Sequence, residues 1–210
     1  MITICWAAKG GSGTTVVAAS IALANPKSTP TLLVDLDRDL PMVLGLAEPD
    51  SPGVHEWLAS TAPVSRLAAL EIAVRPGLEL LPGGPWGAAS TQRWEQFAAA
   101  LAADPRDAIV DVGTRTPPQA LVAVADRTWL VTRPCYLALR AAARTSVHST
   151  GVVLVNEPGH ALRSADVEAA VGTPIAAVLV FDPAISRAVD SGLLVSRFPA
   201  GLTRTLRQAA

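Results

Sequence analysis

The stretch Ile2-Thr3-Ile4-Cys5-Trp6-Ala7-Ala8-Lys9-Gly10-Gly11-Ser12-Gly13-Thr14-Thr15 decides how this chain folds. Its first six residues are apolar or β-prone, glycines follow at three positions, and a run compatible with a helix continues to residue 24. A strand, a glycine loop and a helix in this order place backbone N–H groups and a helix N-terminus where they can bind phosphate oxygens. The stretch therefore predicts an α/β fold with a phosphate-binding loop.

The loop departs from the standard phosphate-binding motif G-x-x-x-x-G-K-[ST] at one position. Thr14 stands where that motif has its lysine, whereas Thr15 keeps the hydroxyl that binds magnesium in such loops. A lysine is present at the front of the loop instead, as Lys9, although the chain has only two lysines against fifteen arginines. The alternative interpretation is a turn rich in glycine and serine that binds no ligand.

With its leading lysine, the loop resembles the deviant Walker A loop of the ParA/MinD family of dimeric ATPases. The resemblance implies a P-loop NTPase-like fold, a site for ATP or ADP with Mg2+, and a homodimer in which Lys9 reaches the partner's nucleotide. Loss of the in-loop lysine is similar to the TadZ/CpaE branch, whose members position Tad-type pili. The residues that the resemblance assigns to nucleotide binding are Lys9, Gly10, Gly11, Ser12, Gly13, Thr14 and Thr15.

Two carboxylates follow at the end of the second predicted strand, residues 31–35. The carboxyl ends of parallel strands form the edge at which open α/β sheets bind ligands. The pair Asp35 and Asp37 resembles the Asp-x-Asp element of the family, which implies that Asp37 lies in the magnesium shell and orients or deprotonates the attacking water. The alternative is that Asp35 caps a loop N–H group and that residues 37–39 are solvated turn residues.

A third motif, Asp107-Ala108-Ile109-Val110-Asp111-Val112-Gly113, is an apolar strand that ends in Asp and then Gly. It resembles the Walker B strand and the start of the switch segment of the family. The resemblance implies that Asp111 holds magnesium through water and that Gly113 lets the backbone approach the γ-phosphate. Arg115 follows in the predicted switch loop, where it contacts phosphate or a partner, or is simply solvated.

The resemblance continues to about residue 195. Residues 152–156 resemble the strand whose terminal asparagine, here Asn156, binds adenine through the paired donor and acceptor of its amide. A turn residue before Glu157 is an equally good interpretation. The three histidines show no metal-ligand spacing, and we expect them at the surface or at helix ends. The terminal segment 202–209 predicts a closing helix, with a membrane-targeting helix as the alternative.

The chain as a whole alternates β-branched runs with amphipathic or alanine-rich segments, which is typical of a mainly parallel sheet with helices on both faces. Residues 39–76 are the least regular and predict a helical excursion over the C-terminal edge of the sheet. No repeat or linker is visible, so we expect a single domain over residues 1–210. The other predicted strands are 2–7, 78–81, 108–111, 128–132, 152–156 and 175–181, and the predicted helices are 15–24, 54–60, 91–103, 117–125, 137–148, 164–171, 183–191 and 202–209.

Composition narrows the classes of function. The net charge of −1 gives no long-range attraction to nucleic acid or anionic lipid. No apolar run reaches the roughly 18–20 residues that a membrane span needs. Two cysteines form no disulfide framework, which favours a reducing cytoplasm. The lysine and apolar run at the start imitate a secretory signal peptide poorly, because glycine and serine interrupt them.

These observations predict a nucleotide-dependent, dimerising positioning protein of the ParA/MinD type that serves a pilus assembly. We expect it in the cytoplasm, recruited to a pole or to the membrane surface through protein partners. ATP hydrolysis should be slow or absent, because Thr14 leaves the β- and γ-phosphates without the usual lysine charge. Two alternatives stand beside this prediction: an active ATPase in DNA partition or division-site placement, and a scaffold that uses the fold without nucleotide.

Overall fold

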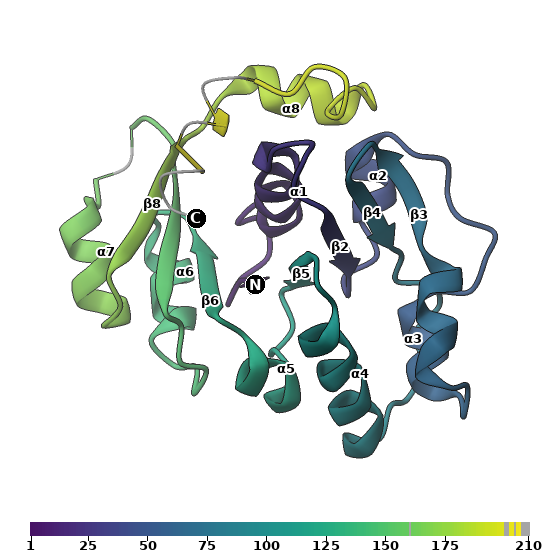
Figure 1. Cartoon of the computed structure of the whole chain (residues 1–210). Coiled ribbons are helices and arrows are strands. Elements are labelled where there is room, and N and C mark those ends of the chain that lie inside the picture. Colours follow the sequence, from purple (N-terminus) through teal and green to yellow (C-terminus); the bar gives the residue numbers. More distant parts are fainter. Residues whose placement is uncertain (160, 200–201, 204, 207–210) are drawn as a thin grey trace.

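The computed structural model describes residues 1–159, 161–199, 202–203 and 205–206. Its centre is an eight-stranded sheet with the order β3-β4-β2-β5-β1-β6-β7-β8 (Figure 1). Neighbouring strands are parallel except for the edge pair of β3 and β4, which is antiparallel. The strands are β1 (Ile2–Trp6), β2 (Thr31–Asp35), β3 (Ile72–Arg75), β4 (Leu78–Leu81), β5 (Asp107–Gly113), β6 (Arg127–Thr132), β7 (Gly151–Asn156) and β8 (Ile175–Val180).

Helices cover both faces of the sheet (Figure 1). One core contains buried side chains of α1 (Thr14–Ala24), α2 (Leu40–Leu44) and α8 (Pro183–Asp190). The core on the other face contains side chains of α3 (Val54–Ala59), α4 (Thr91–Ala103), α5 (Gln119–Val124), α6 (Tyr136–Ala142) and α7 (Ser164–Val171). The mainly parallel sheet with helices on both faces is thus confirmed.

The central strands read as continuous apolar runs because each of their faces is covered. Successive side chains of a strand point to opposite faces, so Val110 and Val112 join the core under α3 to α7, whereas Ile109 joins the core under α1. The same alternation sends Asp111, which is fully buried, to the α1 face. Strand geometry therefore decides which face each motif residue serves.

The segment 39–76 differs from its prediction. It contains α2, α3 and a 3-10 helix at Val64–Leu70, but it ends in a strand, β3, that the sequence did not predict. This strand pairs with β4 across a turn at Pro76 and Gly77. Gly77 has a φ of 79°, in the left-handed region that favours glycine. The Pro-Gly pair between two short apolar runs was the available signal for this hairpin.

Two predicted helices also differ or fall outside the described residues. The helix predicted to reach residue 148 ends at Ala142. The N–H groups of Arg144 and Thr145 then bond to carbonyls three residues back, and the Thr145 hydroxyl accepts a hydrogen bond from the Val147 N–H at 3.2 Å, which favours a turn. Of the helix predicted at 202–209, residues 202–203 and 205–206 are described and helical, and the others lie outside the described residues. Leu206 is buried in the core under α1. Within the described part of the chain, no helix has the length and apolar character needed to cross a bilayer.

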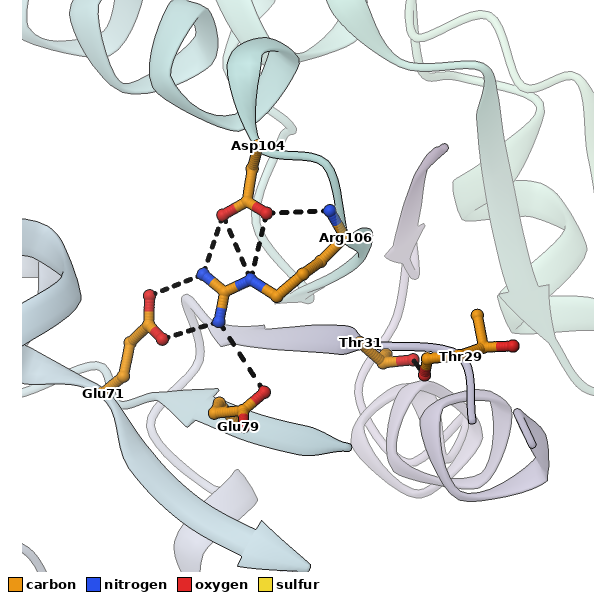
Figure 2. A network of polar contacts seen from close by, with 6 residues as sticks. All are labelled: Thr29, Thr31, Glu71, Glu79, Asp104 and Arg106. Atoms are coloured by element: carbon orange, nitrogen blue, oxygen red, sulfur yellow. Dashed lines mark hydrogen bonds and ion pairs between the residues drawn. The ribbon is translucent and has the colours of Figure 1, made fainter. Parts of the chain in front are cut away.

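An ion cluster holds the antiparallel edge of the sheet to the turn before β5 (Figure 2). The Arg106 guanidinium donates to both oxygens of Glu71, at 2.7 and 2.8 Å, and to Asp104 at 2.7 Å. Glu79 of β4 lies 3.7 Å from the same guanidinium. Arg106 lowers the pKa of Asp104 mainly through these hydrogen bonds. The cluster lies at the start of β5, at the end of the sheet away from the sequence motifs.

Candidate functional site

The three sequence motifs meet at the carboxyl edge of the sheet. They follow β1, β2 and β5, which are neighbours in the sheet, and they line one cavity of about 260 Å3. Parallel neighbouring strands place their carboxyl ends together, which is why motifs far apart in sequence converge here. The lining residues are Gly11, Ser12, Gly13, Thr14, Thr15, Val16, Asp37, Asp39, Met42, Val43, Gly113 and Thr114.

The glycine loop presents its backbone to this cavity. Gly11 and Gly13 have φ of 79° and 86°, and a Cβ atom built at either one meets no atom within 4 Å. Gly13 is the N-cap of α1 and supplies no side-chain cap. The Ser12 hydroxyl donates to the Lys9 carbonyl at 2.8 Å and so braces the loop. An uncapped helix N-terminus with open space before it has N–H groups available for an anion.

The loop's remaining polar side chains lie in three different environments. Thr14, at the position of the usual lysine, is buried, and Thr15 is half-buried. Lys9 is exposed, and within the described part of the chain its ammonium forms no hydrogen bond or ion pair. The two threonine side chains thus lie toward the inside of the loop, and Lys9 lies at its outer surface.

Asp111 is the most constrained carboxylate at this edge. It is fully buried, and its Oδ1 accepts a hydrogen bond from the Gly113 N–H at 3.0 Å. Its Oδ2 is buried and accepts no hydrogen bond from the described residues. Burial is the main cause that raises its pKa to about 7, and the charge of Asp35 adds to it, whereas the nearby Thr15 hydroxyl lowers it. A buried oxygen without a donor fits a bound cation or a proton.

Asp35 caps the loop that follows β2, as one of the two interpretations of the sequence predicts. Its carboxylate accepts hydrogen bonds from the N–H groups of Asp37, Arg38 and Leu40, at 3.1, 2.6 and 3.2 Å. Burial still raises the pKa of Asp35 to about 6. These bonds hold Arg38 at φ 80°, which is unusual for a residue with a side chain. Asp35 therefore shapes the loop that presents Asp37.

Asp37 is half-buried and lies directly beside the switch segment. A Cβ atom at Gly113, whose φ is 62°, would overlap the Asp37 carboxylate. Burial and the charge of Asp39 raise the pKa of Asp37, and the Arg115 guanidinium lowers it. No group of three His, Cys, Asp or Glu side chains among the described residues is arranged to hold a metal. A cation here would therefore need the Thr15 hydroxyl, phosphate oxygens and water as further ligands.

Asn156 lies at the end of β7, where its carbonyl accepts a hydrogen bond from the Phe181 N–H at 2.8 Å. Near it, a cavity of about 110 Å3 lies between α1 and the segment after β8, and it is lined by Val155, Arg133 and Phe181 but not by Asn156. The Arg133 guanidinium carbon lies 6.0 Å from the centre of the Phe181 ring. Neither side chain was predicted to belong to the site, and the available signal for Phe181 was an aromatic residue at the end of the predicted strand 175–181.

Solved structures share this architecture, although no protein-family model and no curated protein sequence matches the chain. A ParA family ATPase from Chlorobium tepidum TLS is 21% identical, with a TM-score of 0.76 over 98% of this chain and 96% of that one. The cell division ATPase MinD of Pyrococcus furiosus is 23% identical, with a TM-score of 0.75 over 99% and 96%. The septum site-determining protein MinD of Pyrococcus horikoshii OT3, complexed with Mg-ADP, is 20% identical, with a TM-score of 0.74 over 99% and 93%. The chain has the fold of the ParA/MinD ATPases.

Proposed function

We propose that this chain binds ATP or ADP with Mg2+ in the cavity at the carboxyl edge of β1, β2 and β5, as a single nucleotide-binding domain. The observation that carries the proposal is that backbone donors without acceptors and a carboxylate oxygen without a donor lie close together. Uncapped N–H groups of the glycine loop face the cavity, and the buried Asp111 Oδ2 beside it accepts no hydrogen bond from the described residues. A nucleotide phosphate with its cation complements both.

In this proposal each motif has one role. Backbone N–H groups from Gly10 to Thr15 bind the phosphates, and the Thr15 hydroxyl binds Mg2+ together with Asp37 and, through water, Asp111. The cation neutralises phosphate charge when it is bound. Asp37 orients the attacking water, which its position against Gly113 supports. The adenine base of the nucleotide lies toward Asn156 and the cavity beside Phe181. That cavity is small and mainly apolar, which suits a planar ring.

Hydrolysis is slow in this proposal because Thr14 supplies no charge to the β- and γ-phosphates. An arginine finger, which also supplies positive charge to the transferred phosphate, raises the rate of phosphoryl transfer by roughly 10³–10⁵-fold, so a missing charge near these phosphates is costly. Thr14→Lys should therefore tighten nucleotide binding and raise turnover. If the unmodified chain already turns over at the rate of ordinary ATPases of this fold, another cation replaces the missing lysine and this part is wrong.

Lys9 is the proposed contact to a second copy. Its ammonium is exposed and, within the described residues, forms no internal hydrogen bond or ion pair, so it is available to a partner's phosphates as a point charge. A nucleotide that binds mainly the dimer shifts association by mass action. Lys9→Ala should abolish the nucleotide-dependent part of dimerisation in sedimentation experiments, whereas Lys27→Ala serves as the matched control. Equal association with and without nucleotide would remove this switch.

The positioned machinery is the least constrained part of the proposal. The missing in-loop lysine favours pilus positioning of the TadZ/CpaE type, whereas the solved structures of a ParA family ATPase and of MinD equally support DNA partition or division-site placement. A fluorescent fusion of the full chain in its native host separates these functions. Foci that coincide with pilus bases support the first, and patterns on the nucleoid or at the septum support the second.

Thermal unfolding with nucleotide tests the site itself. ATP or ADP with Mg2+ should raise the melting temperature, since a ligand that binds only the folded chain stabilises it. Thr15→Val should lose the Mg2+-dependent part of this shift, and Thr61→Val, which alters an exposed loop threonine, should keep it. No shift at millimolar nucleotide, with or without Mg2+, would favour the nucleotide-free scaffold.

A further inference from the structure

A second and larger cavity lies at the same edge of the sheet, on the face covered by α3 and α4. We call it the Trp86 pocket. Its volume of about 440 Å3 is in the range of ligand and side-chain binding sites. Leu36, Trp94 and Val112 contribute apolar walls, and Trp86 and Arg115 border it. None of the sequence motifs except the switch segment points to this pocket.

Two guanidinium groups converge on the Trp86 ring. The Arg115 guanidinium carbon lies 3.5 Å from the ring centre, and that of Arg38 lies 5.8 Å from it. Neither guanidinium forms a hydrogen bond or an ion pair within the part of the chain that the structure describes. Their donors therefore face solvent or the pocket, beside an indole that is itself 42% exposed.

Acidic side chains do not neutralise Arg115 inside the pocket, because the residues that line the cavity include no Asp or Glu. Arg38 does not line the pocket itself but a neighbouring cavity of about 130 Å3, which Asp35 and Glu48 also line. Asp37 is close enough for Arg115 to lower its pKa, but it lines the other cavity. Glu56 of α3 is engaged by the Gly53 N–H at 2.8 Å. The pocket thus joins an apolar interior to a positively charged rim.

His55 of α3 packs against the Trp86 indole. Its ring centre lies 4.1 Å from that of Trp86, and its Nε2 lies 3.2 Å from the Leu36 carbonyl. Because a carbonyl oxygen only accepts, Nε2 carries the proton. Burial lowers the pKa of His55, the hydrogen bond to the Leu36 carbonyl raises it, and the Arg115 and Arg38 charges lower it further. The ring contact and the hydrogen bond together tie the indole to the loop after β2.

We propose that the Trp86 pocket docks an acidic peptide segment of a partner protein, with a bulky apolar side chain in the cavity and an adjacent carboxylate on Arg115 and Arg38. Arginine binds carboxylate through paired, charge-assisted hydrogen bonds. Exposed Trp and Arg side chains beside a pocket are the residue types that dominate protein interfaces. A nucleic acid is less well matched, because two cations around one apolar hollow do not form the extended basic stripe that a phosphate backbone needs.

Peptide binding to the full chain, without nucleotide, tests the proposal. The probes are short fluorescein-labelled peptides in which a central Leu or Phe is flanked by Glu, together with matched peptides that carry Gln instead. In low salt, the dissociation constant of the Glu peptides should be lower than that of the Gln peptides by a factor of roughly ten or more. Arg115→Gln and Trp86→Ala should each cause a similar loss, whereas Arg140→Gln, at an exposed arginine of α6, should not.

Melting temperatures of the variants show whether each one folds. The test is independent of the nucleotide site, because Thr15→Val should bind the Glu peptides as well as the unmodified chain does. Equal binding of Glu and Gln peptides, or binding that survives both pocket substitutions, would overturn the proposal. So would the absence of binding at millimolar peptide. Tighter binding of a single-stranded oligonucleotide that the same substitutions abolish would assign the pocket to nucleic acid instead.

Discussion

Two arginine–tryptophan stacks lie on the same face of the sheet and differ in what surrounds them. In the first, the Arg93 guanidinium carbon lies 3.7 Å from the centre of the Trp57 ring, and the indole is only 3% exposed. In the second, Arg115 lies 3.5 Å from the Trp86 ring, which is 42% exposed. The ring distances are nearly equal, so the contact alone does not separate the two stacks.

The hydrogen bonds of the two guanidinium groups do separate them. Arg93 donates to the carbonyls of Trp57 and Ala62, at 2.7 and 3.1 Å, and to the Gln96 side chain at 2.7 Å. The Arg115 guanidinium donates to no group within the described residues, and only its backbone N–H forms a hydrogen bond, to the Val112 carbonyl at 3.3 Å. The Nε of Arg93 is buried without a partner among the described residues, but both terminal nitrogens bind acceptors of the fold. An arginine whose terminal nitrogens are engaged in this way stabilises the fold, and one whose terminal nitrogens are free can bind a partner. The first stack is therefore structural, and the second is available for recognition.

The largest expected effect is on stability. Arg93→Gln should lower the free energy of unfolding by about 2–3 kcal/mol, because it removes charged hydrogen bonds and leaves the Trp57 and Ala62 carbonyls with poorer partners. Arg115→Gln should change it by no more than about 0.5 kcal/mol, as is usual for exposed positions. Urea unfolding of both variants measures the difference. Equal losses would mean that the second stack is structural too.

The segment that carries Arg115 can be tested through Gly113. Gly113→Ala should cost about 2 kcal/mol or more, because the residue has φ 62° and its Cβ would overlap the Asp37 carboxylate. Gly172→Ala is the matched control, since its φ of 72° is similar but its Cβ would meet no atom within 4 Å. It should cost about 1 kcal/mol through backbone strain alone. Similar losses in urea unfolding would show that Asp37 moves aside freely.

The sequence predicted the parts of this edge that follow from local rules. The glycine loop follows from its position between an apolar strand and a helix, and the convergence of the strand ends follows from their parallel order. For Asp35 and Asp37 the sequence leaves two interpretations, an Asp37 in a magnesium shell or an Asp35 that caps the loop with Asp37 to Asp39 solvated, because spacing alone does not show how the loop folds. Three hydrogen bonds from the following loop assign the capping role to Asp35.

The Trp86 pocket could not be predicted in the same way. It depends on contacts between His55, Trp86 and Arg115, which lie on three separate segments of the chain. No local period or motif marks such contacts, and the segment before Trp86 is a run of Pro and Gly that predicts only a loop. His55 itself was expected at the surface or at a helix end. It lies in the first turn of α3, near a helix end as expected, but it is buried against the indole.

Iodide quenching of tryptophan emission sharpens the comparison with a smaller effect. Trp86→Phe should remove most of the emission that iodide quenches, because this exposed indole lies beside two cations that attract the anion. Trp57→Phe should leave that component in place, since its ring is buried. Caesium, a cationic quencher, should show little preference for Trp86. Strong quenching by caesium would contradict the positive rim.

The smallest expected effect is electrostatic and concerns His55. Arg115→Gln should raise the pKa of His55, because the Arg115 cation disfavours the imidazolium, whereas Arg93→Gln should not. Burial remains the main cause of the lowered pKa in both variants.

Because the pKa of His55 in the folded chain lies below the ordinary 6.5, the chain loses stability as pH falls through that range, and the Arg115→Gln variant should lose less. Titration of the histidine ring protons by NMR measures the shift directly. An unchanged pKa in Arg115→Gln would show that the guanidinium moves away from the indole in solution, and the second stack would then be no fixed counterpart of the first.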